Sequence, residues 1–193
     1  MSIDDEAIDR LVAAARDGDP DAFGALFDQY YGPVHRFVAA RVGRPNDAED
    51  LAQLVFVKAL EALPRYEPRG VPFGGWLFKL ARNVVIDHIR TRREHGALDL
   101  VVEHTSEDAG PDDLAVLRQE LDSVALALRH LTPDQRLAIE LRFFAGLSAK
   151  EAADVMDRQE GTVRGLQFRA IAALRRELGI EADDLPEASG LAR

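Results

Sequence analysis

Apolar side chains recur at steps of three or four residues along almost the whole chain, and this spacing constrains the fold more than any other feature. The clearest stretch is Phe23, Leu26, Phe27, Tyr30, Tyr31, Val34, Phe37 and Val38. Side chains three and four apart share one face of an α-helix, whereas a half-buried strand would alternate apolar and polar residues. No run rich in β-branched residues lies between hairpin turn signals. The pattern therefore predicts an all-α fold.

Helix boundaries in the first half divide it into several segments. Gly32 and Pro33 predict a break or kink in the first long apolar stretch. Asn46 is a candidate N-cap, with Glu49 three residues later, for a helix that runs to about residue 63. A loop rich in Pro, Gly and Arg follows, and then a long helix from 73 to about 93 with a basic C-terminal end. We expect a first domain over residues 1–95.

The second half opens with an acidic stretch and continues with short helices. Residues 96–110 lack sustained periodicity and predict a flexible acidic linker, and a helix is expected over 111–130. Thr132 with Gln135, and Ser148 with Glu151, both match capping boxes. The last helix is expected from about 159 to 178, closed by Gly179. A short helix, a tight turn and a longer helix are typical of a helix-turn-helix, so a second domain is expected over 111–180, before an acidic tail at 181–193.

The charge distribution separates these parts. The formal net charge is −10, which by itself disfavours nucleic acid because affinity for DNA comes largely from neutralising phosphates. Residues 65–94, however, hold seven basic and three acidic side chains, and residues 142–176 hold seven and four. Two basic blocks thus alternate with acidic segments, and this asymmetry predicts partners better than the total does.

Composition argues against several classes of protein. The chain has no cysteine, so disulfides and thiolate chemistry are excluded, and its five histidines lack the spacing of metal ligands. No glycine-rich phosphate loop joins a strand to a helix, and no nucleophile has a visible base. We therefore expect no enzymatic activity, no cofactor and no metal. The acidic N-terminus and the lack of a long apolar run predict a cytoplasmic protein without membrane insertion.

The last helix has two contrasting faces. Val163, Leu166, Ala170 and Leu174 form an apolar stripe at about 100° per residue. The opposite face carries Gly161, Arg164, Gly165, Phe168 and Arg169. Arginines can contact phosphates or guanine edges, Phe168 can lie on a thymine methyl, and glycines allow close approach to a major groove. The alternative is the solvated face of an ordinary helical hairpin.

Three segments carry a resemblance to a known family. LSAKEAADVM at residues 147–156, followed by EGTVR at 160–164, resembles region 4 of the extracytoplasmic-function (ECF) sigma factors, which belong to the sigma-70 family. DAEDLAQLVFVKAL at 47–60 resembles region 2.2 of the same family, and GWLFKLARN at 75–83 resembles the start of its promoter-melting helix. The motifs occur in the family's order, and the resemblance covers most of 21–93 and 114–178.

The resemblance implies that region 2.2 docks on core RNA polymerase, at a helical coiled coil of the clamp of its largest subunit. The residues expected to make this contact are Asp47, Asp50, Gln53, Leu54 and Val57. Helix capping is an equally good interpretation of Asp47 and of Glu49. Leu51, Val55 and Phe56 are more typical of a core.

The resemblance also implies contact with promoter DNA. For the minus-ten element, the loop before the Trp-bearing helix and that helix itself provide Arg65, Tyr66, Arg69, Trp76, Lys79, Arg82, Asn83 and Arg90, which suit single-stranded bases and phosphates. Trp76 has a second interpretation as a core anchor. For the minus-thirty-five element, the expected contacts of the helix-turn-helix are Lys150, Gly161, Thr162, Arg164, Gly165, Phe168 and Arg169. The acidic linker would thread through the polymerase cleft, and a solvated tether is its alternative.

The sequence departs from the family pattern on the recognition helix. Many members have a basic residue followed by Leu where this chain has Leu166 and Gln167, and Ser and His where it has Gly165 and Phe168. Two hydrogen-bonding side chains are therefore missing from the DNA face. An anti-sigma factor is a further partner that the resemblance implies. The competing function, a stand-alone helix-turn-helix repressor, would leave the segment at 47–60 without a purpose, and a structural adaptor explains still less.

Overall fold

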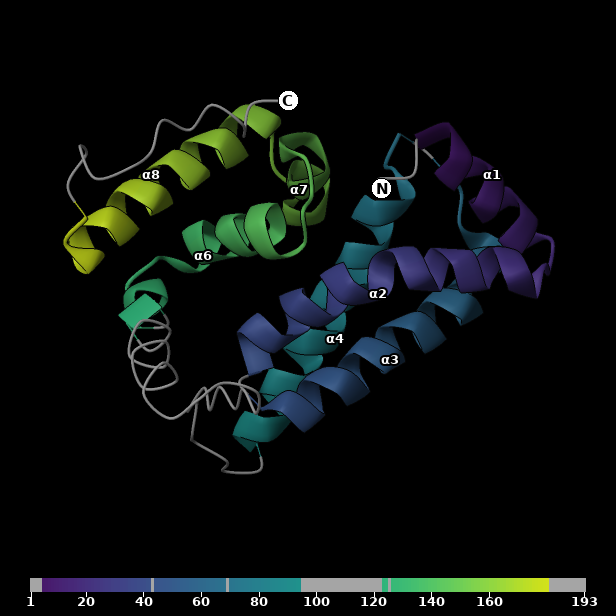
Figure 1. The fold of residues 1–193 in the computed structure, drawn as a ribbon, viewed down its shortest axis with the longest axis horizontal. Helices are drawn as coiled ribbons and strands as arrows, with labels where there is room; N and C mark the ends of the chain where they lie inside the picture. Colours follow the sequence, from purple (N-terminus) through teal and green to yellow (C-terminus); the bar gives the residue numbers. More distant parts are fainter. Residues whose placement is uncertain (1–4, 43, 69, 95–122, 125, 181–193) are drawn as a thin grey trace, which may run out of the picture.

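The computed structural model describes residues 5–42, 44–68, 70–94, 123–124 and 126–180, and within them all regular structure is helical. The first half contains α1 (Asp5–Arg16), α2 (Pro20–Val42), α3 (Pro45–Ala62), the 3₁₀ turn η1 (Leu63–Arg65) and α4 (Phe73–Glu94). The second half contains α6 (Pro133–Ile139), the π-helical turn η2 (Glu140–Phe144), α7 (Ala149–Met156) and α8 (Glu160–Leu178) (Figure 1). The predicted all-α class is confirmed.

The first four helices pack around a core of the expected apolar residues. Val34, Phe37 and Val38 of α2 are fully buried, and the ring of Phe37 meets that of Phe78 of α4 edge-on, with centroids 5.6 Å apart. Leu51, Val55 and Phe56 of α3 are buried as predicted. Edge-to-face aromatic contacts add to the stabilisation that burial provides. This core fixes the two helices, α3 and α4, on which the polymerase and minus-ten contacts are expected.

Two helix boundaries in the first half differ from the prediction. Of the break or kink predicted at Gly32 and Pro33, the break is absent, because α2 continues through Pro33. Asn46 is not the N-cap of α3; Arg44 occupies that position without a side-chain cap, and Pro45 is the first helical residue. Proline suits this position because its φ is already helical and the first N–H of a helix has no intrahelical partner.

The helix starts in the second half follow the prediction closely. Thr132 and Gln135 form a reciprocal capping box at α6, with N–H to side-chain oxygen distances of 3.0 and 3.3 Å. Ser148 and Glu151 do the same at α7, with distances of 2.8 and 3.2 Å. Gly179 ends α8 in the left-handed region at φ 65°, which glycine adopts without strain. The π-helical turn η2 was not predicted.

The Ser148 cap is expected to stabilise the helix-turn-helix measurably. Ser148→Ala removes one acceptor from the first turn of α7 and should lower the free energy of unfolding by ~1 kcal/mol. Ser148→Asp, which keeps an acceptor at the same place, should retain most of that stability. Urea unfolding followed by circular dichroism measures both variants. Equal losses in the two variants would show that the cap hydrogen bond is not the source of stability.

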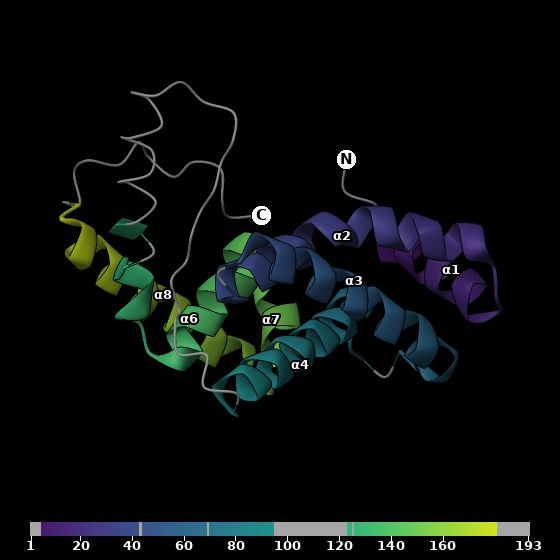
Figure 2. The same ribbon diagram turned by 90° about the horizontal axis from the view of Figure 1, so that it is seen from below.

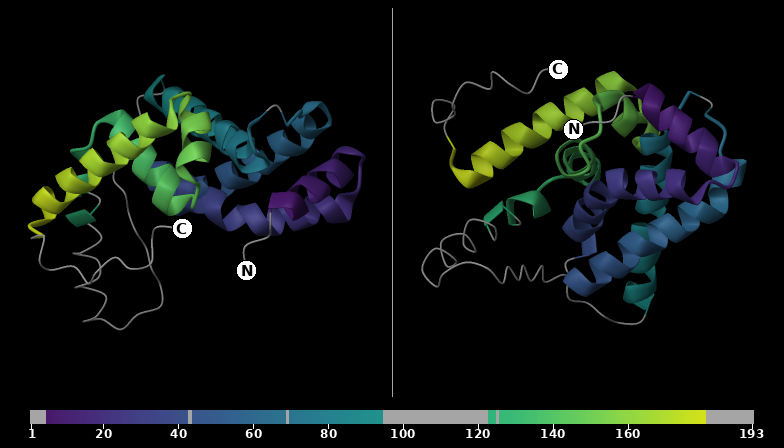
Figure 3. Two further views of the ribbon diagram at one scale, coloured as in Figure 1. Left: turned by 90° about the horizontal axis from the view of Figure 1, so that it is seen from above. Right: turned by 45° about the vertical axis from the view of Figure 1, so that its right-hand side comes forward.

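The two halves of the chain pack against each other. One continuous cluster of buried apolar residues includes Val38 and Phe78 from the first half and Leu141 and Val155 from the second. Figure 2 shows α7 beside α4, and the right-hand view of Figure 3 shows the α6–η2 segment beside α2; both pairs are in contact. The predicted linker at 96–110 and the tail at 181–193 lie outside the described residues, as does most of the helix predicted over 111–130.

Candidate nucleic-acid interface

The face of α8 that was predicted to meet DNA is exposed. Val163, Leu166 and Ala170 are buried and Leu174 is half-buried, so the apolar stripe packs as predicted. On the opposite face the exposed residues are Gly161, Thr162, Arg164, Phe168 and Arg169, with Gly165 half-buried among them. Phe168 is 76% exposed. Phe168 therefore contributes little to the core, and its ring is accessible to a partner.

A left-handed residue forms the turn of the helix-turn-helix, and a half-buried arginine connects its last helix to the segment before its first. Asp157 closes α7 at φ 53°, a conformation that Asp adopts more readily than most residues. The Arg142 guanidinium donates to the carbonyl of Leu147 and, at 3.1 Å, to Oε1 of Gln167 on α8. Gln167, which departs from the family pattern, thus connects α8 to the segment before α7. Lys150 is exposed on α7.

The loop and helix predicted to hold the minus-ten element form an aromatic cluster. Tyr66 is only 5% exposed, its hydroxyl donates to the carbonyl of Val71 at 3.0 Å, and burial raises the pKa of its phenol. The centroid of its ring lies 4.8 Å from that of half-buried Trp76, and the Trp76 and Phe73 ring centroids are 5.4 Å apart. Tyr66 and Trp76 thus pack against each other where the loop meets α4. Trp76 packs as its interpretation as a core anchor predicted, and DNA contact by either residue stays a prediction.

The predicted phosphate contacts on α4 have different surroundings. Lys79 Nζ lies 2.9 Å from Oδ1 of Asp157, and Arg82 Nη1 donates to the carbonyl of Val155 at 3.5 Å. Both partners belong to the helix-turn-helix segment. Arg65 and Asn83 are exposed, and exposed Arg90 pairs with Asp87 at 3.4 Å. Arg69 lies outside the described residues.

The predicted polymerase contacts lie along one exposed strip of α3, with one exception. Asp50, Gln53, Leu54 and Val57 are exposed, and Leu54 and Val57 remain 40% and 52% accessible. Asp47 is half-buried instead. Its Oδ2 lies 3.2 Å from Nη1 of Arg92 and 3.7 Å from Nε2 of His88, so it ties the start of α3 to the end of α4.

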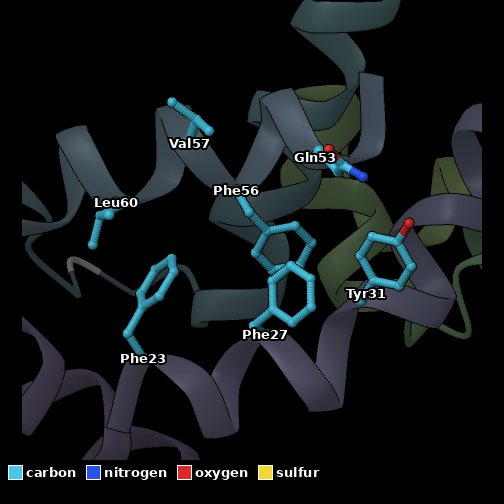
Figure 4. Close-up of a pocket in the computed structure, with 7 residues that line it drawn as sticks. All are labelled: Phe23, Phe27, Tyr31, Gln53, Phe56, Val57 and Leu60. Atoms are coloured by element: carbon cyan, nitrogen blue, oxygen red, sulfur yellow. The ribbon is translucent and has the colours of Figure 1, made fainter. Parts of the chain in front are cut away.

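A shallow apolar groove adjoins this strip and contains residues that the sequence did not single out. It is lined by Gln53, Phe56, Val57 and Leu60 of α3 and by Phe23, Phe27 and Tyr31 of α2 (Figure 4). Leu60 is 53% exposed and follows Val57 by three residues, the spacing that places it on the same face. That spacing was a readable signal for Leu60. The three α2 aromatics carried no comparable signal, because their own pattern indicated core.

The described residues hold no other obvious chemical site. They contain no group of three or more His, Asp or Glu side chains placed to bind a metal ion. Among the helices described, none is both long enough and apolar enough to cross a membrane.

Two family models match the chain. Residues 26–95 match Sigma-70 region 2, and residues 127–176 match Sigma-70, region 4. The two matches lie in this order, on the two halves that the fold brings together.

Curated relatives match nearly the whole chain. It is 33% identical to the ECF RNA polymerase sigma factor SigD of Mycobacterium tuberculosis over 189 residues, which are 95% of this chain and 89% of that protein. It is 30% identical to SigX of Bacillus subtilis over 86% of the chain and 88% of that protein. For BldN of Streptomyces coelicolor the identity is 38%, over 89% of this chain and 66% of the longer relative.

Solved structures have the same fold. CnrH, in complex with the cytosolic domain of CnrY, is similar with a TM-score of 0.70 and 29% identity, over 91% of this chain and 99% of that one. The sigma factor RpoE of Bartonella quintana, in complex with the anti-sigma factor NepR, has a TM-score of 0.65 and 26% identity, over 82% and 98% of the two chains.

Proposed function

Because the chain belongs to the ECF sigma factors of the sigma-70 family, which bind core RNA polymerase and direct transcription initiation, we propose how its surfaces divide that work. The α3 strip docks on the polymerase clamp, α4 and the loop before it hold the minus-ten element, and α8 reads the minus-thirty-five element. The observation that carries the proposal is the exposed face of α8, where Arg164 and Phe168 lie opposite the buried side chains of Val163, Leu166 and Ala170. Membership of this family argues against a stand-alone repressor.

The docking part is supported by the α3 strip and its groove. Asp50 and Gln53 offer polar groups beside the exposed apolar side chains of Leu54 and Val57. An amphipathic partner helix is recognised through such a combination, with apolar anchors at helical spacing and polar contacts around them. Leu60 and the groove extend the apolar part of this surface toward α2.

The domain limits and the remaining partners are part of the proposal. We assign residues 1–95 to region 2 and 111–180 to region 4, with 96–110 as the connection and 181–193 as a tail. The relatives CnrH and RpoE were each solved with a protein that binds them, an anti-sigma factor in the case of RpoE. An anti-sigma factor is the corresponding partner for this chain, and the cytoplasm, where the polymerase works, is its location.

The role of α8 is tested by changing one exposed arginine. Arg164→Ala should reduce initiation at a cognate promoter about tenfold, because a side chain that reads a base edge contributes ~1–3 kcal/mol. Its ion pair with Glu160, at 2.6 Å within α8, is exposed and contributes little to stability. Run-off transcription with purified core enzyme on a promoter library identifies the promoter and measures the loss.

The matched control is Arg176→Ala, an exposed arginine at the far end of α8, which should leave initiation within twofold. Core affinity should be unchanged in both variants. Equal loss of initiation in the two variants, or unaltered initiation by Arg164→Ala, would contradict the assignment of the reading face.

A further inference from the structure

Gln167 lies at the border between the packed and the exposed faces of α8. Val163 and Leu166 are buried on one side of the helix, and Arg164 and Phe168 are exposed on the other. At about 100° per residue, Gln167 lies about 40° from Val163 and about 60° from Arg164 around the helix axis. Its side chain is half-buried, so it has contact both with the protein and with solvent.

The apolar packing of α8 changes beside this residue. Val163 and Leu166 belong to the main cluster of buried apolar side chains, whereas Ala170 belongs to a smaller cluster with Leu131 and Ile139. Apolar attraction is non-directional, so it holds a helix against a core but specifies its rotation and tilt less closely than a hydrogen bond does. A hydrogen bond between the two clusters is therefore well placed to orient α8.

Arg142 provides such a directional contact. Its Nε donates to Oε1 of Gln167 at 3.1 Å, and its Nη1 donates to the carbonyl of Leu147. The N–H of Leu147 donates to the carbonyl of Leu141 at 3.0 Å, and the next residue, Ser148, is the N-cap of α7. The guanidinium is planar and holds its donors in a fixed geometry. Arg142 therefore sets α8 relative to the start of α7.

The contact depends on the carbonyl oxygen of the Gln167 side chain. Arginine has donors only, so the amide must present this oxygen to Arg142. An apolar side chain at the same position would leave the Arg142 Nε without this acceptor. The family pattern commonly has Leu here, where this chain has Gln167. The bridge between Arg142 and Gln167 is thus a feature of this chain rather than of the common pattern.

A polar contact near the other end of α8 is more exposed. His130 Nδ1 lies 2.9 Å from Oε2 of Glu177, and the two side chains are 55% and 36% accessible. Exposed pairs of this kind contribute little. Arg142 and Gln167 are both half-buried, and a hydrogen bond from a charged donor is stronger where water is partly excluded. The orientation of α8 is therefore determined more at Gln167 than at Glu177.

We propose that Gln167 is a positioning residue for promoter recognition: through Arg142 it fixes the rotation and tilt of α8, and so sets which bases the exposed face can reach. This inference rests on the proposed reading of the minus-thirty-five element by α8. Base edges are recognised by directional hydrogen bonds, whereas phosphate contacts carry no sequence information. A recognition helix that is loosely held loses selectivity for sequence before it loses affinity for DNA.

Two substitutions of Gln167 test the role of its oxygen. Gln167→Met keeps an unbranched side chain of similar length but removes the carbonyl oxygen. Gln167→Glu keeps an oxygen acceptor for Arg142. Gln, Met and Glu have similar helix propensities, so the intrinsic stability of α8 is nearly constant. Glu177→Ala, which removes the exposed pair with His130, is the matched control at the other end of the helix.

Run-off transcription with core polymerase on a promoter library measures selectivity, the ratio of initiation on a preferred element to that on a singly substituted one. Gln167→Met should lower minus-thirty-five selectivity about fivefold, the effect of one lost hydrogen bond, while minus-ten selectivity and core affinity change less than about twofold. Gln167→Glu and Glu177→Ala should keep minus-thirty-five selectivity within about twofold. The charge of Glu repels phosphates of every sequence alike, so it lowers initiation but not selectivity.

A double-mutant cycle determines whether Gln167 acts through Arg142. Arg142→Met should lower minus-thirty-five selectivity by itself, because it removes the donor. In that background Gln167→Met should have almost no further effect, since the bridge is already absent. A further loss of about fivefold would show that Gln167 contacts DNA directly and would overturn the positioning role. Circular dichroism establishes that each variant is folded.

Three other results would also overturn the proposal. Unchanged minus-thirty-five selectivity in Gln167→Met would show that the bridge does not orient α8. Equal losses in Gln167→Met and Gln167→Glu would show that the oxygen acceptor is not the cause. An equal loss of initiation on every promoter, with selectivity intact, would show a role in folding alone.

Arg164→Ala tests the proposed function separately. If Arg164→Ala leaves minus-thirty-five selectivity intact while Gln167→Met lowers it, the positioning role stands and Arg164 is the wrong reading residue. If Arg164→Ala lowers this selectivity and Gln167→Met does not, the proposed function stands and the positioning role is rejected.

Discussion

Asp50→Arg is expected to weaken binding to core RNA polymerase about 30-fold, which corresponds to ~2 kcal/mol, the usual lower limit for an interface hot spot. Asp50 is exposed in the first turns of α3, one helical turn before Gln53 and Leu54. If Asp50 meets a basic group of the polymerase, reversing its charge both removes a polar contact and places like charges together across the interface, which is more costly than truncation. The fold should be unaffected, because the side chain is in solvent. Competition binding against a labelled sigma factor measures the affinity.

The control for this variant is Asp17→Arg. Asp17 is exposed beyond the end of α1, and the substitution changes the net charge by the same amount. Figure 1 shows that this end of the molecule lies far from the start of α3. Asp17→Arg should keep core affinity within about twofold, since a distant surface charge acts only through screened long-range attraction. If both variants weaken binding equally, the loss comes from the change in net charge, and the assignment of the α3 strip to polymerase docking is wrong.

The parts of the fold that the sequence predicted are those set by local chemistry. The capping boxes at Thr132 and Ser148 and the left-handed Gly179 depend on residues within one turn of each other, so a short window contains all the information. The two faces of α8 follow in the same way from helical periodicity. Local chemistry misled at Asn46, where a good capping residue lies beside Pro45, and proline sets the first helical position.

Some side chains have partners that the sequence did not predict. In each case the partner comes from a segment that is distant in the sequence. Lys79 and Asp157 are 78 residues apart, and nothing near either one predicts the pair. Asp47 looked like a capping or docking carboxylate, yet its partners Arg92 and His88 come from the end of another helix. Glu140 is the extreme case: a carboxylate in an amphipathic helix should face solvent, but it is completely buried.

Glu140→Ala should lower the free energy of unfolding by ~3 kcal/mol, because removing one member of a buried ion pair leaves the other charge uncompensated. Glu140 Oε2 lies 2.5 Å from Nη2 of Arg41, and Oε1 lies 3.1 Å from Nε of Arg136. The Arg41 guanidinium is itself largely buried, 5.3 Å from the centroid of the Phe37 ring, and would lose its carboxylate. Denaturant unfolding of the full chain measures the loss.

Glu177→Ala is the matched control, because Glu177 forms an exposed pair with His130 at 2.9 Å and should contribute less than about 1 kcal/mol. Comparable losses in the two variants would mean that Arg41 finds another partner or reaches solvent when the halves separate. In that case the buried carboxylate would not hold α2 and η2 together.

The pH dependence of stability provides an independent check on the same carboxyl. Burial raises the pKa of Glu140 above its ordinary value of 4.5, and the two arginines offset this only in part. The folded chain therefore binds this proton more tightly than the unfolded chain. Its contribution to stability is complete below about pH 4.5 and is lost as the pH rises through the raised value. Glu140→Gln cannot titrate, so the unfolding free energy of the wild type minus that of Glu140→Gln should fall over this range. A rise would mean that Arg41 and Arg136 outweigh the cost of burial, and that the ionised pair favours the folded chain.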